Sequence, residues 1–418
     1  MNNQAFSKSS FARCLRDSDF YSYNYLRSND KKNELLTNTV KKAESLWNSS
    51  IDIEKVKLGN KTGYVSGSFS EKLILRRCVV NLKNNFNIVF KHRNQITKEL
   101  KAHLCDGTEY RIYKLDIKSF FESVDTDELM VTLGDNEKLS LHTKKLIKQY
   151  LKHFNGIHQS GLPRGIELSP ILADIILKEF DHYISTHYEV YFYQRFVDDI
   201  VILTTMNEDK RKFMKLLSAQ LKKANSNLRF NFVKQRIIDV ERLIDKNPTS
   251  KIDKKIEFSF LGYKYIILNP WVKKDKRHWR MRTVEIGISD KKVKQFKTKI
   301  YQSFYDYLRT GDNTLLIDRL IFLSTNRDMV SSNNKKIATG IFYNYCMIGK
   351  NISDLKKIDS TLHQLILSPK GRLNNMIKNS IPIDLKRTVL KISFQRGYEK
   401  KIFKKYSLDR LSEITKIW

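Results

Sequence analysis

The chain has 418 residues, enough for about two or three domains, and 41% of them are hydrophobic, so it can form extensive buried cores. Its 77 Lys and Arg residues against 45 Asp and Glu residues give a formal net charge of +32. Such a charge causes strong self-repulsion unless a polyanion shares the surface, so we expect nucleic acid as a partner, with a membrane surface as the rival.

The composition argues against several other classes of protein. No uninterrupted apolar run reaches about 18 residues, and the N-terminal sequence MNNQAFSKSSFARCLRDSDF lacks the apolar core of a signal peptide. We therefore expect a folded, soluble, cytoplasmic protein with no membrane partner. The cysteines are far apart and form no C-x-x-C pair, so we expect reduced, structural thiols and neither a zinc module nor a disulfide framework.

The N-terminal region is polar and then basic. Residues 1–60 are rich in Ser, Asn and Lys and are expected to form a helical or irregular extension. In residues 63–89, short apolar pieces alternate with cations, and we interpret these pieces as β-strands. The cations of this region and just after it, represented by Arg77, Lys91 and Arg93, are candidates for holding a triphosphate or a template backbone. A solvated basic face is an equally good interpretation.

The next segments alternate between helix and strand patterns. Helical spacing predicts a helix over residues 96–104. From Tyr110 the sequence alternates as a strand, which places Ile112, Lys114 and Asp116 on one face. Asp116 is therefore expected at the end of a strand.

A helical region and a glycine-rich loop follow. Asp125 begins a capping-box pattern at the start of a helix, and a second helix is expected over residues 137–153. The loop over residues 156–170, GIHQSGLPRGIELSP, leads into an apolar helix over residues 171–180. A glycine-rich turn before a helix N-terminus lets backbone amides approach a ligand, although this arrangement is common.

Two adjacent acids follow in the sequence YFYQRFVDDIVIL, residues 191–203, which predicts a β-hairpin with Asp198 and Asp199 at its tip. Neighbouring acids repel each other and are costly to desolvate, so a divalent cation would explain them; an ordinary acidic turn has the same pattern. Nucleotidyl transfer uses two Mg²⁺ ions held by acids, one activating a 3′-hydroxyl and one holding the triphosphate. Asp116 completes such a site if its strand and the hairpin are neighbours in one sheet.

The segments after the hairpin continue the alternation. A charged helix is expected over residues 207–224 and a strand over residues 228–234. Residues 256–266 alternate like one further strand, with Gly262 in its interior, where another backbone or a ligand comes close.

The C-terminal part is strongly basic. Within residues 271–309 an amphipathic helix carries a lysine cluster that is suited to following phosphates, including Lys292, Lys294 and Lys297. Its apolar stripe is expected to pack in a core. The remainder of the chain is expected to form further helices that carry Lys and Arg throughout.

Four motifs occur in a fixed order, namely LDIKSFFESV, GLPRGIELSP, FVDDIVIL and FSFLGYKY. Together they resemble the palm motifs of reverse transcriptases, specifically the bacterial ones related to retrons and group II intron enzymes, and most closely the defence-associated ones. The resemblance covers roughly residues 70–268. It implies an α+β right-hand polymerase with an N-terminal extension (1–60), fingers and a palm with an antiparallel sheet (61–268), and a basic helical thumb (269–418).

The resemblance also implies roles for single residues. Asp116, Asp198 and Asp199 correspond to the metal-binding carboxylates, and the Ile117 carbonyl to a contact of the triphosphate-side metal. Phe121 corresponds to the aromatic ring beneath the incoming sugar, which excludes a 2′-hydroxyl; either Phe120 or Phe121 is expected to pack in the core.

Other positions depart from the family pattern or match it in part. Arg164, beside Gly165 in the loop that contacts nucleotide and template, stands where the family commonly has Gln, so this loop is expected to carry an extra positive charge. Lys234 resembles a lysine proposed to protonate pyrophosphate, although Val233 and Gln235 do not match. The family's primer-supporting turn corresponds to Phe260, Leu261, Gly262 and Tyr263.

The resemblance predicts an RNA-directed DNA polymerase that adds dNTPs to a 3′-hydroxyl with two Mg²⁺ ions, in bacterial antiviral defence with a dedicated non-coding RNA. Its partners would be this RNA template, the DNA product and dNTPs; a homo-oligomer or a second protein of a defence operon stays open. The alternatives are a retron or group II intron-type RNA-binding enzyme, untemplated or protein-primed DNA synthesis, and a non-catalytic RNA-binding scaffold.

Overall fold

The structure is a computed structural model that describes residues 3–49, 51–59, 61–158, 160–243, 255–274, 277–330, 336–368 and 371–418. The chain forms two compact units, each made of two segments. The first unit contains Met1–His92 and Glu109–Arg242, and the second contains Arg93–Thr108 and Leu243–Trp418. These units differ from the expected division into extension, fingers with palm, and thumb, which stays a prediction.

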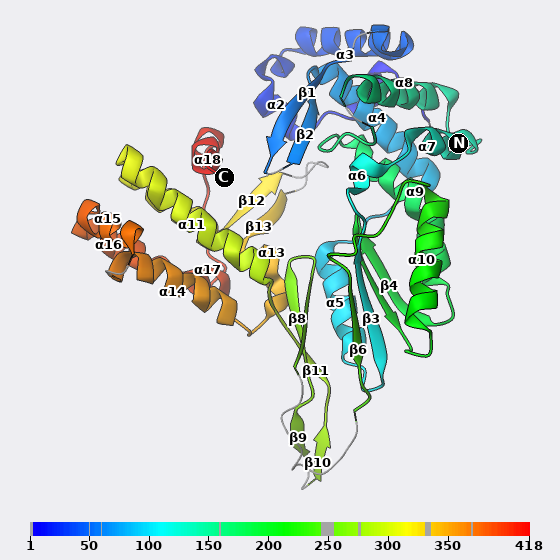
Figure 1. Ribbon diagram of the computed structural model, residues 1–418. Coiled ribbons are helices and arrows are strands. Elements are labelled where there is room, and N and C mark those ends of the chain that lie inside the picture. Colours follow the sequence, from blue (N-terminus) through cyan, green and yellow to red (C-terminus); the bar gives the residue numbers. More distant parts are fainter. Residues whose placement is uncertain are drawn as a thin grey trace. The chain divides into compact units, whose positions relative to one another are not determined.

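The first unit combines helices with one central sheet (Figure 1). Its elements are α1 (Lys8–Ala12), α2 (Asp17–Ser22), η1 (Asn24–Arg27), α3 (Asn29–Glu44), η2 (Leu46–Ser49), β1 (Ile53–Leu58), β2 (Lys61–Ser66), α4 (Phe69–Phe86), β3 (Tyr110–Asp116), α6 (Phe120–Ser123), α7 (Thr126–Gly134), α8 (Leu141–Ile157), α9 (Leu168–Ser185), β4 (Val190–Phe196), β5 (Asp199–Thr204), α10 (Lys210–Ala224) and β6 (Arg236–Val240).

The central sheet has four antiparallel strands in the order β4-β5-β3-β6, so β3 and β5 occupy its middle. Tyr113 and Leu115 of β3 belong to a hydrophobic core that includes residues of α9 and α10. Lys114 and Asp116 lie on the other face, which confirms the alternation expected for this strand.

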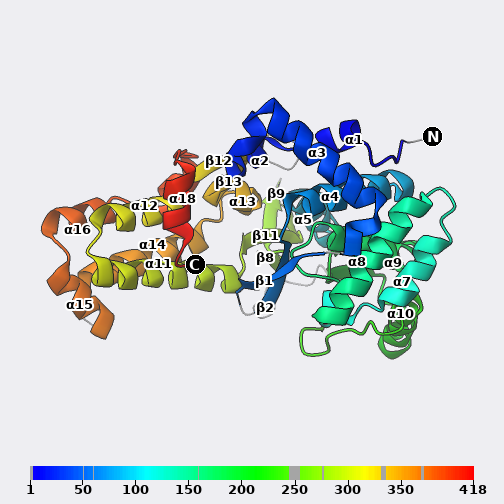
Figure 2. The same cartoon turned by 90° about the horizontal axis from the view of Figure 1, so that it is seen from above.

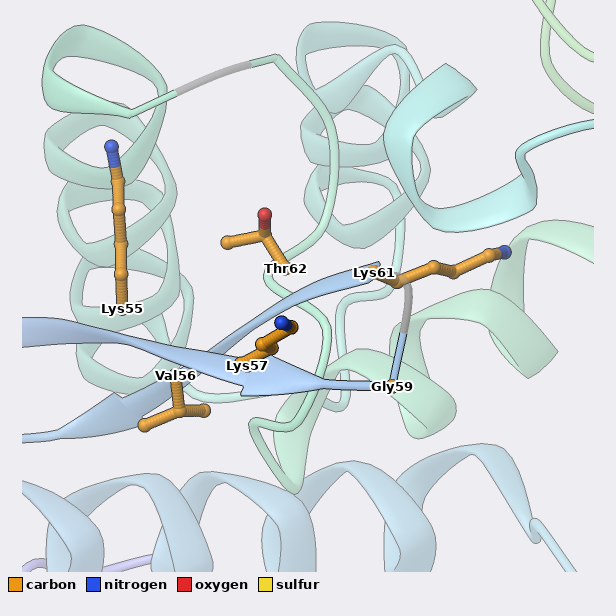
Figure 3. A pocket seen from close by; sticks show the side chains of 6 residues that line it. All are labelled: Lys55, Val56, Lys57, Gly59, Lys61 and Thr62. Carbon is orange, nitrogen blue, oxygen red and sulfur yellow. The ribbon is translucent and has the colours of Figure 1, made fainter. Parts of the chain in front are cut away.

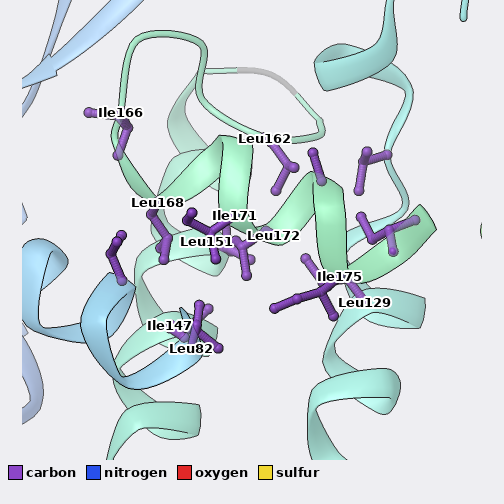
Figure 4. Packing of buried hydrophobic residues seen from close by; sticks show 14 of the residues in the cluster. Leu82, Leu129, Ile147, Leu151, Leu162, Ile166, Leu168, Ile171, Leu172 and Ile175 are labelled. Atoms are coloured by element: carbon purple, nitrogen blue, oxygen red, sulfur yellow. The ribbon is translucent and has the colours of Figure 1, made fainter. Parts of the chain in front are cut away.

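The helices of the first unit share one core. In Figure 4, Leu82 of α4, Ile147 of α8 and Leu172 of α9 lie together, and all three side chains are fully buried. Packing of this kind makes α9 a rigid support for the sheet, because buried side chains held on several sides can move little without opening voids.

Several expected elements are confirmed with shifted ends. The hairpin with the two acids is β4 and β5, and Asp125 caps α7 by accepting hydrogen bonds from the backbone N–H groups of Asp127 and Glu128. The helix expected from residue 137 begins at Leu141, because Ser140 caps it through its hydroxyl.

Some of the strands expected in the first unit are wrong. Residues 73–75 lie within the helix α4, because apolar side chains such as Ile74, Cys78 and Leu82 recur at helical spacing around them. Residues 228–234 form only an isolated bridge between Ile117 and Phe230, and the strand that follows is β6. Strands do form earlier, in the β1–β2 hairpin.

The single strand expected over residues 256–266 is instead a hairpin of β7 (Ile256–Phe260) and β8 (Tyr263–Leu268). Leu261 and Gly262 form its two-residue turn, with φ of 49° and 79°. Two consecutive positive φ angles are the pattern of a type I′ turn, which matches the twist of hairpin strands and favours glycine. Gly262 therefore supports a turn and not a strand interior.

The second unit is more helical. Its other elements are α5 (Arg93–Leu104), β9 (Trp271–Lys274), β10 (Arg277–Arg280), β11 (Thr283–Ile288), α11 (Asp290–Thr310), α12 (Asn313–Ser324), β12 (Asn326–Val330), β13 (Lys336–Gly340), α13 (Ile341–Tyr345), η3 (Cys346–Ile348), α14 (Ser353–Leu367), α15 (Arg372–Ser380), α16 (Ile383–Leu390), α17 (Phe394–Glu399) and α18 (Leu408–Thr415). The sequence and buried residues of α11 confirm the expected basic amphipathic helix, and the helices that follow confirm the helical C-terminal part. Figures 1 and 2 show α11 beside α14.

The fold confirms the expected α+β class, with antiparallel sheets and a largely helical C-terminal part. No helix in the described part of the chain is long and apolar enough to cross a membrane. The four cysteines form no disulfide among the described residues.

Candidate active site

Three aspartates lie close together at one edge of the first unit's sheet, where β3 ends and β5 begins. Asp116, the last residue of β3, is the direct cross-strand partner of Asp199, the first residue of β5. Asp198 precedes it in the hairpin turn and accepts a hydrogen bond at its carbonyl from the backbone N–H of Ile117, at 3.1 Å. The strand that ends at Asp116 and the hairpin that carries Asp198 and Asp199 are therefore neighbours in one sheet, as a site made of all three acids requires.

The local environment disfavours negative charge on Asp198 and Asp199. Burial, followed by the charge of Asp198, raises the pKa of Asp199 to about 6. Burial also raises the pKa of Asp198, to which the charge of Asp116 contributes. Crowded, partly desolvated carboxylates gain stability from a nearby cation. Their all-oxygen donor set is the kind that Mg²⁺ prefers.

Lys234 supplies a cation to this site. Its ammonium donates to both carboxylate oxygens of Asp116, at 2.8 and 2.9 Å, and this hydrogen bond raises the pKa of the lysine. The side-chain amide of Asn231 also donates to Asp116, at 3.3 Å. Within the residues that the structure describes, no group of three or more His, Cys, Asp or Glu side chains is arranged to hold a metal ion. The aspartates therefore share one edge of the sheet without forming a closed ligand cage.

Two residues near Asp116 were not among the expected site residues. Lys114, two positions before Asp116, is partly buried; burial lowers its pKa while the charges of Asp199 and Asp116 act against this. Because side chains alternate between the two faces of β3, Lys114 lies on the same face as Asp116, and this pattern could have identified it as a site residue from the sequence. Asn231 also had a usable signal, because it begins the short segment NFVKQ that contains Lys234.

Phe121 and Phe120 have different environments. Phe120 is buried in the hydrophobic core, which confirms that one of the two rings packs there, whereas Phe121 is only partly buried. The guanidinium of Arg164 lies 5.0 Å from the centre of the Phe121 ring. Phe121 is therefore the more accessible of the two rings, with an arginine against it.

Arg164 does not add a free positive charge to its loop. Its Nη2 donates to both carboxylate oxygens of Glu122, at 2.8 and 3.1 Å. Burial alone would raise the pKa of Glu122, but the hydrogen bond and charge of Arg164 lower it. The expected extra charge of the loop is corrected: the arginine forms a local ion pair.

The loop that carries Arg164 is fixed by backbone contacts. The N–H of Leu162 donates to the Phe121 carbonyl at 2.7 Å, and the N–H of Tyr64 in β2 donates to the Arg164 carbonyl at 2.7 Å. Gly161, with φ of 98°, lies so close that a Cβ would be 2.3 Å from the Phe121 carbonyl oxygen. Glycine is required here for close approach to the chain's own backbone. Gly165 also has a positive φ, of 99°.

The three candidate phosphate-binding cations have different local surroundings. Arg77 is buried and donates to the backbone carbonyls of Asn3 and Ala5, so it anchors the N-terminal segment and is corrected as a candidate. Lys91 lines a groove of about 620 Å³ that Phe196 and Val197 also line. Arg93 belongs to the second unit, and the three residues thus have separate environments.

A different set of cations lies on the β1–β2 hairpin. Figure 3 shows a hollow of about 380 Å³ lined by Lys55, Val56, Lys57, Gly59, Lys61 and Thr62. The charge of Lys61 partly opposes the rise in the pKa of Asp198 and contributes to the lowered pKa of Glu122, so its ammonium lies within electrostatic range of the site. The sequence analysis missed this lysine because it placed the strands of this region after residue 63.

The expected primer-supporting residues lie in the second unit. Phe260 and Tyr263 are buried, so only the Leu261–Gly262 turn between them is partly exposed. A Cβ on Gly262 would lie 3.6 Å from Lys292 Cε and 3.7 Å from Arg93 Nη1.

The lysines expected on α11 differ in their exposure to solvent. Lys294 is exposed, whereas Lys297 is partly buried.

The Arg93 guanidinium stacks over the rings of Tyr263 and Tyr345. Arg93 and Lys292 therefore both lie close to the Leu261–Gly262 turn.

An antiparallel sheet with paired aspartates at the ends of its middle strands defines a polymerase-like palm. Residues 72–265 match the family described as reverse transcriptase (RNA-dependent DNA polymerase), which confirms the expected resemblance.

One curated relative is also a reverse transcriptase. The chain is 25% identical over 199 residues to the retron Ec73 reverse transcriptase of Escherichia coli, which covers 44% of this chain and 62% of that protein. Solved structures with weaker similarity include apo telomerase from Candida tropicalis, at 14% identity, a TM-score of 0.36, 93% of this chain and 72% of the other. Telomerase from Candida albicans in complex with a telomeric RNA fragment is 11% identical, with a TM-score of 0.35, over 88% of this chain and 61% of the other.

Proposed function

We propose that this protein is an RNA-directed DNA polymerase that adds dNTPs to a 3′-hydroxyl with two Mg²⁺ ions. The observation that carries the proposal is the cross-strand pairing of Asp116 with Asp199, beside Asp198 in the turn, within a reverse transcriptase domain. Asp116 and Asp198, with Asp199 as the third carboxylate and the Ile117 carbonyl as a further oxygen, would hold the ions. When bound, these ions lower the pKa of the attacking hydroxyl and neutralise charge on the triphosphate.

The other residues of the site have complementary roles in this proposal. Lys61 lies within electrostatic range of Asp198 and is suited to binding triphosphate oxygens. Phe121, held by Arg164, forms the floor beneath the sugar. Lys234 forms an ion pair with Asp116, and its protonated ammonium is suited to giving a proton to the leaving pyrophosphate.

We further propose that the protein acts in bacterial antiviral defence, in the cytoplasm, and copies a dedicated non-coding RNA. The formal charge of +32 supports a polyanionic partner, and the α11 lysines and the Leu261–Gly262 turn are candidates for holding the template–product duplex. The second candidate is a retron-type enzyme that binds one structured RNA, which the similarity to a retron reverse transcriptase favours.

The test is primer extension with purified protein, an RNA template, a DNA primer, dNTPs and Mg²⁺. Asp198→Ala should abolish incorporation, whereas Asp135→Ala, which alters an exposed aspartate of the same unit, should keep it. Incorporation by Asp198→Ala at the control rate would refute the proposed site. Absence of incorporation by the unaltered protein on any added template would leave the non-catalytic scaffold as the better reading.

The template proposal has its own experiment. Nucleic acid that co-purifies with the unaltered protein is sequenced with and without dNTPs, beside the Asp198→Ala variant. One abundant RNA and its complementary DNA are expected only when the site is intact. DNA without a complementary RNA would instead indicate untemplated synthesis, and phage plating with and without the gene tests the defence role.

A further inference from the structure

A buried arginine lies beside the turn that carries the catalytic acids. Arg195 is on β4, and its side chain is 7% exposed. Its Nε and Nη2 donate to the two carboxylate oxygens of Asp181, at 2.8 and 2.6 Å. Its Nη1 donates to Asp174, at 2.9 Å, and to the backbone carbonyl of Val197, at 3.0 Å. One guanidinium thus joins two acids to the backbone of the hairpin turn.

The turn that Arg195 holds is strained. Phe196 pairs with Asp199, so Val197 and Asp198 are the two central residues of the turn. Val197 has φ of 58°, in the left-handed region where glycine is favoured and β-branched side chains are rare. Such a backbone persists only when its surroundings fix it, and strained residues of this kind cluster at functional sites.

The two acids that hold Arg195 come from one rigid helix. Asp174 and Asp181 are seven residues apart on α9, which is about two helical turns, so they lie on the same face. The hydroxyl of Tyr193 donates to Asp181 and adds a further contact between β4 and this helix. The hairpin tip is therefore tied to α9, whose apolar side chains, such as Leu172 and Ile176, are buried in the core of the unit.

We propose that Arg195 is a positioning residue for the polymerase site: it fixes the carbonyl of Val197 and thereby the placement of the Asp198 and Asp199 carboxylates for their cations. This inference rests on the proposed function. A guanidinium suits this role because its donors are fixed in a plane and point in several directions at once. A lysine keeps the positive charge but lacks the fixed fork that binds Asp174, Asp181 and the carbonyl together.

The chain offers a matched control at the other end of the same sheet. Arg111 on β3 has a side chain that is 8% exposed, and it also binds two acids, Asp239 at 2.6 Å and Glu208 at 2.7 Å. It also donates to a backbone carbonyl, that of Glu208, at 2.9 Å. Arg111 lies five residues before Asp116 on its strand, which is about 17 Å away. Arg111→Lys therefore repeats the structural perturbation without touching the acidic turn.

The experiment compares Arg195→Lys with Arg111→Lys at a temperature where circular dichroism shows both variants folded. Polymerisation is measured with poly(rA), oligo(dT) and dTTP against Mg²⁺ concentration, and Mn²⁺ binding to the free protein is measured by electron paramagnetic resonance. Because small misplacements of reacting groups are costly, Arg195→Lys should lower kcat by about 10- to 100-fold. It should also weaken Mn²⁺ binding, whereas Arg111→Lys should leave both near the unaltered values.

A second pair of variants tests the cause. Val197→Gly places at the strained position a residue that adopts positive φ freely, so Arg195→Lys should cost less activity in that background than in the unaltered chain. Asp174→Asn, which keeps Arg195 but weakens one anchor, should change Mn²⁺ binding in the same direction as Arg195→Lys.

Equal kcat and equal Mn²⁺ affinity for Arg195→Lys and Arg111→Lys would overturn the inference. The same conclusion would follow if the loss caused by Arg195→Lys were undiminished by Val197→Gly. If neither the unaltered protein nor Arg111→Lys polymerises, the proposed function fails, and the Mn²⁺ comparison still decides whether Arg195 positions the acids.

Discussion

Asp199 is expected to destabilise the metal-free protein at neutral pH. Its pKa of about 6, against 3.8 for an ordinary aspartate, means that the folded state resists ionisation of this group. Since one pKa unit corresponds to about 1.4 kcal/mol, the cost at pH 7.5 is at most about 3 kcal/mol. Asp199→Asn removes the charge with little change of shape and should raise the free energy of unfolding by about 1–3 kcal/mol, while abolishing polymerisation.

The pH dependence of this effect has a definite sign. Between the unfolded pKa near 3.8 and the folded pKa of about 6, the folded state binds more protons than the unfolded state. The unaltered protein should therefore lose stability from this group as the pH rises through that window. The advantage of Asp199→Asn should be small at pH 4.5 and large at pH 7.5.

Urea unfolding in EDTA at these two pH values measures the difference, with Asp135→Asn as the exposed control. Mg²⁺ should then stabilise the unaltered protein at pH 7.5 and have less effect on Asp199→Asn, because a cation relieves the repulsion only where the charge exists. Equal stability of the two proteins at pH 7.5 in EDTA would refute the reasoning that burial and Asp198 disfavour the charge.

Three further substitutions have expected outcomes. Phe121→Ala should admit ribonucleotides in competition assays with dNTPs, and unchanged selectivity would remove the ring from its assigned role. Lys61→Ala should raise the KM for dNTPs several-fold, whereas Lys55→Ala on the same hairpin should change it less; equal effects would indicate general electrostatics. Gly161→Ala should lower the free energy of unfolding by more than about 1 kcal/mol, because its Cβ would meet the Phe121 carbonyl at a positive φ. Gly156→Ala, where a Cβ meets nothing within 4 Å, should not be destabilising.

Local sequence patterns determined much of the candidate site. The alternation ending at Asp116 and the apolar flanks of Asp198 and Asp199 predicted the strand and the hairpin that the structure contains. These predictions succeeded because strand alternation and hairpin turns depend on neighbouring residues alone. The helical spacing within α11 was equally local.

Some predictions were wrong because the same local sequence pattern is compatible with two different secondary structures. The short apolar piece at 73–75 fits a strand as well as a helix, and only its continuation to Leu82 decides for α4. The Leu261–Gly262 turn looked like a strand interior, because alternation continues on both sides of it.

Only the tertiary structure decided which distant side chains meet. The pairing of Lys234 with Asp116, of Arg164 with Glu122, and the burial of Arg77 against the N-terminal segment each join residues far apart in the sequence or in different elements. A sequence pattern gives the face of an element on which a side chain lies, but it does not give the element that packs against that face. The charge of a residue is thus set by its type, whereas its availability to a ligand is set by the partners that the fold brings to it.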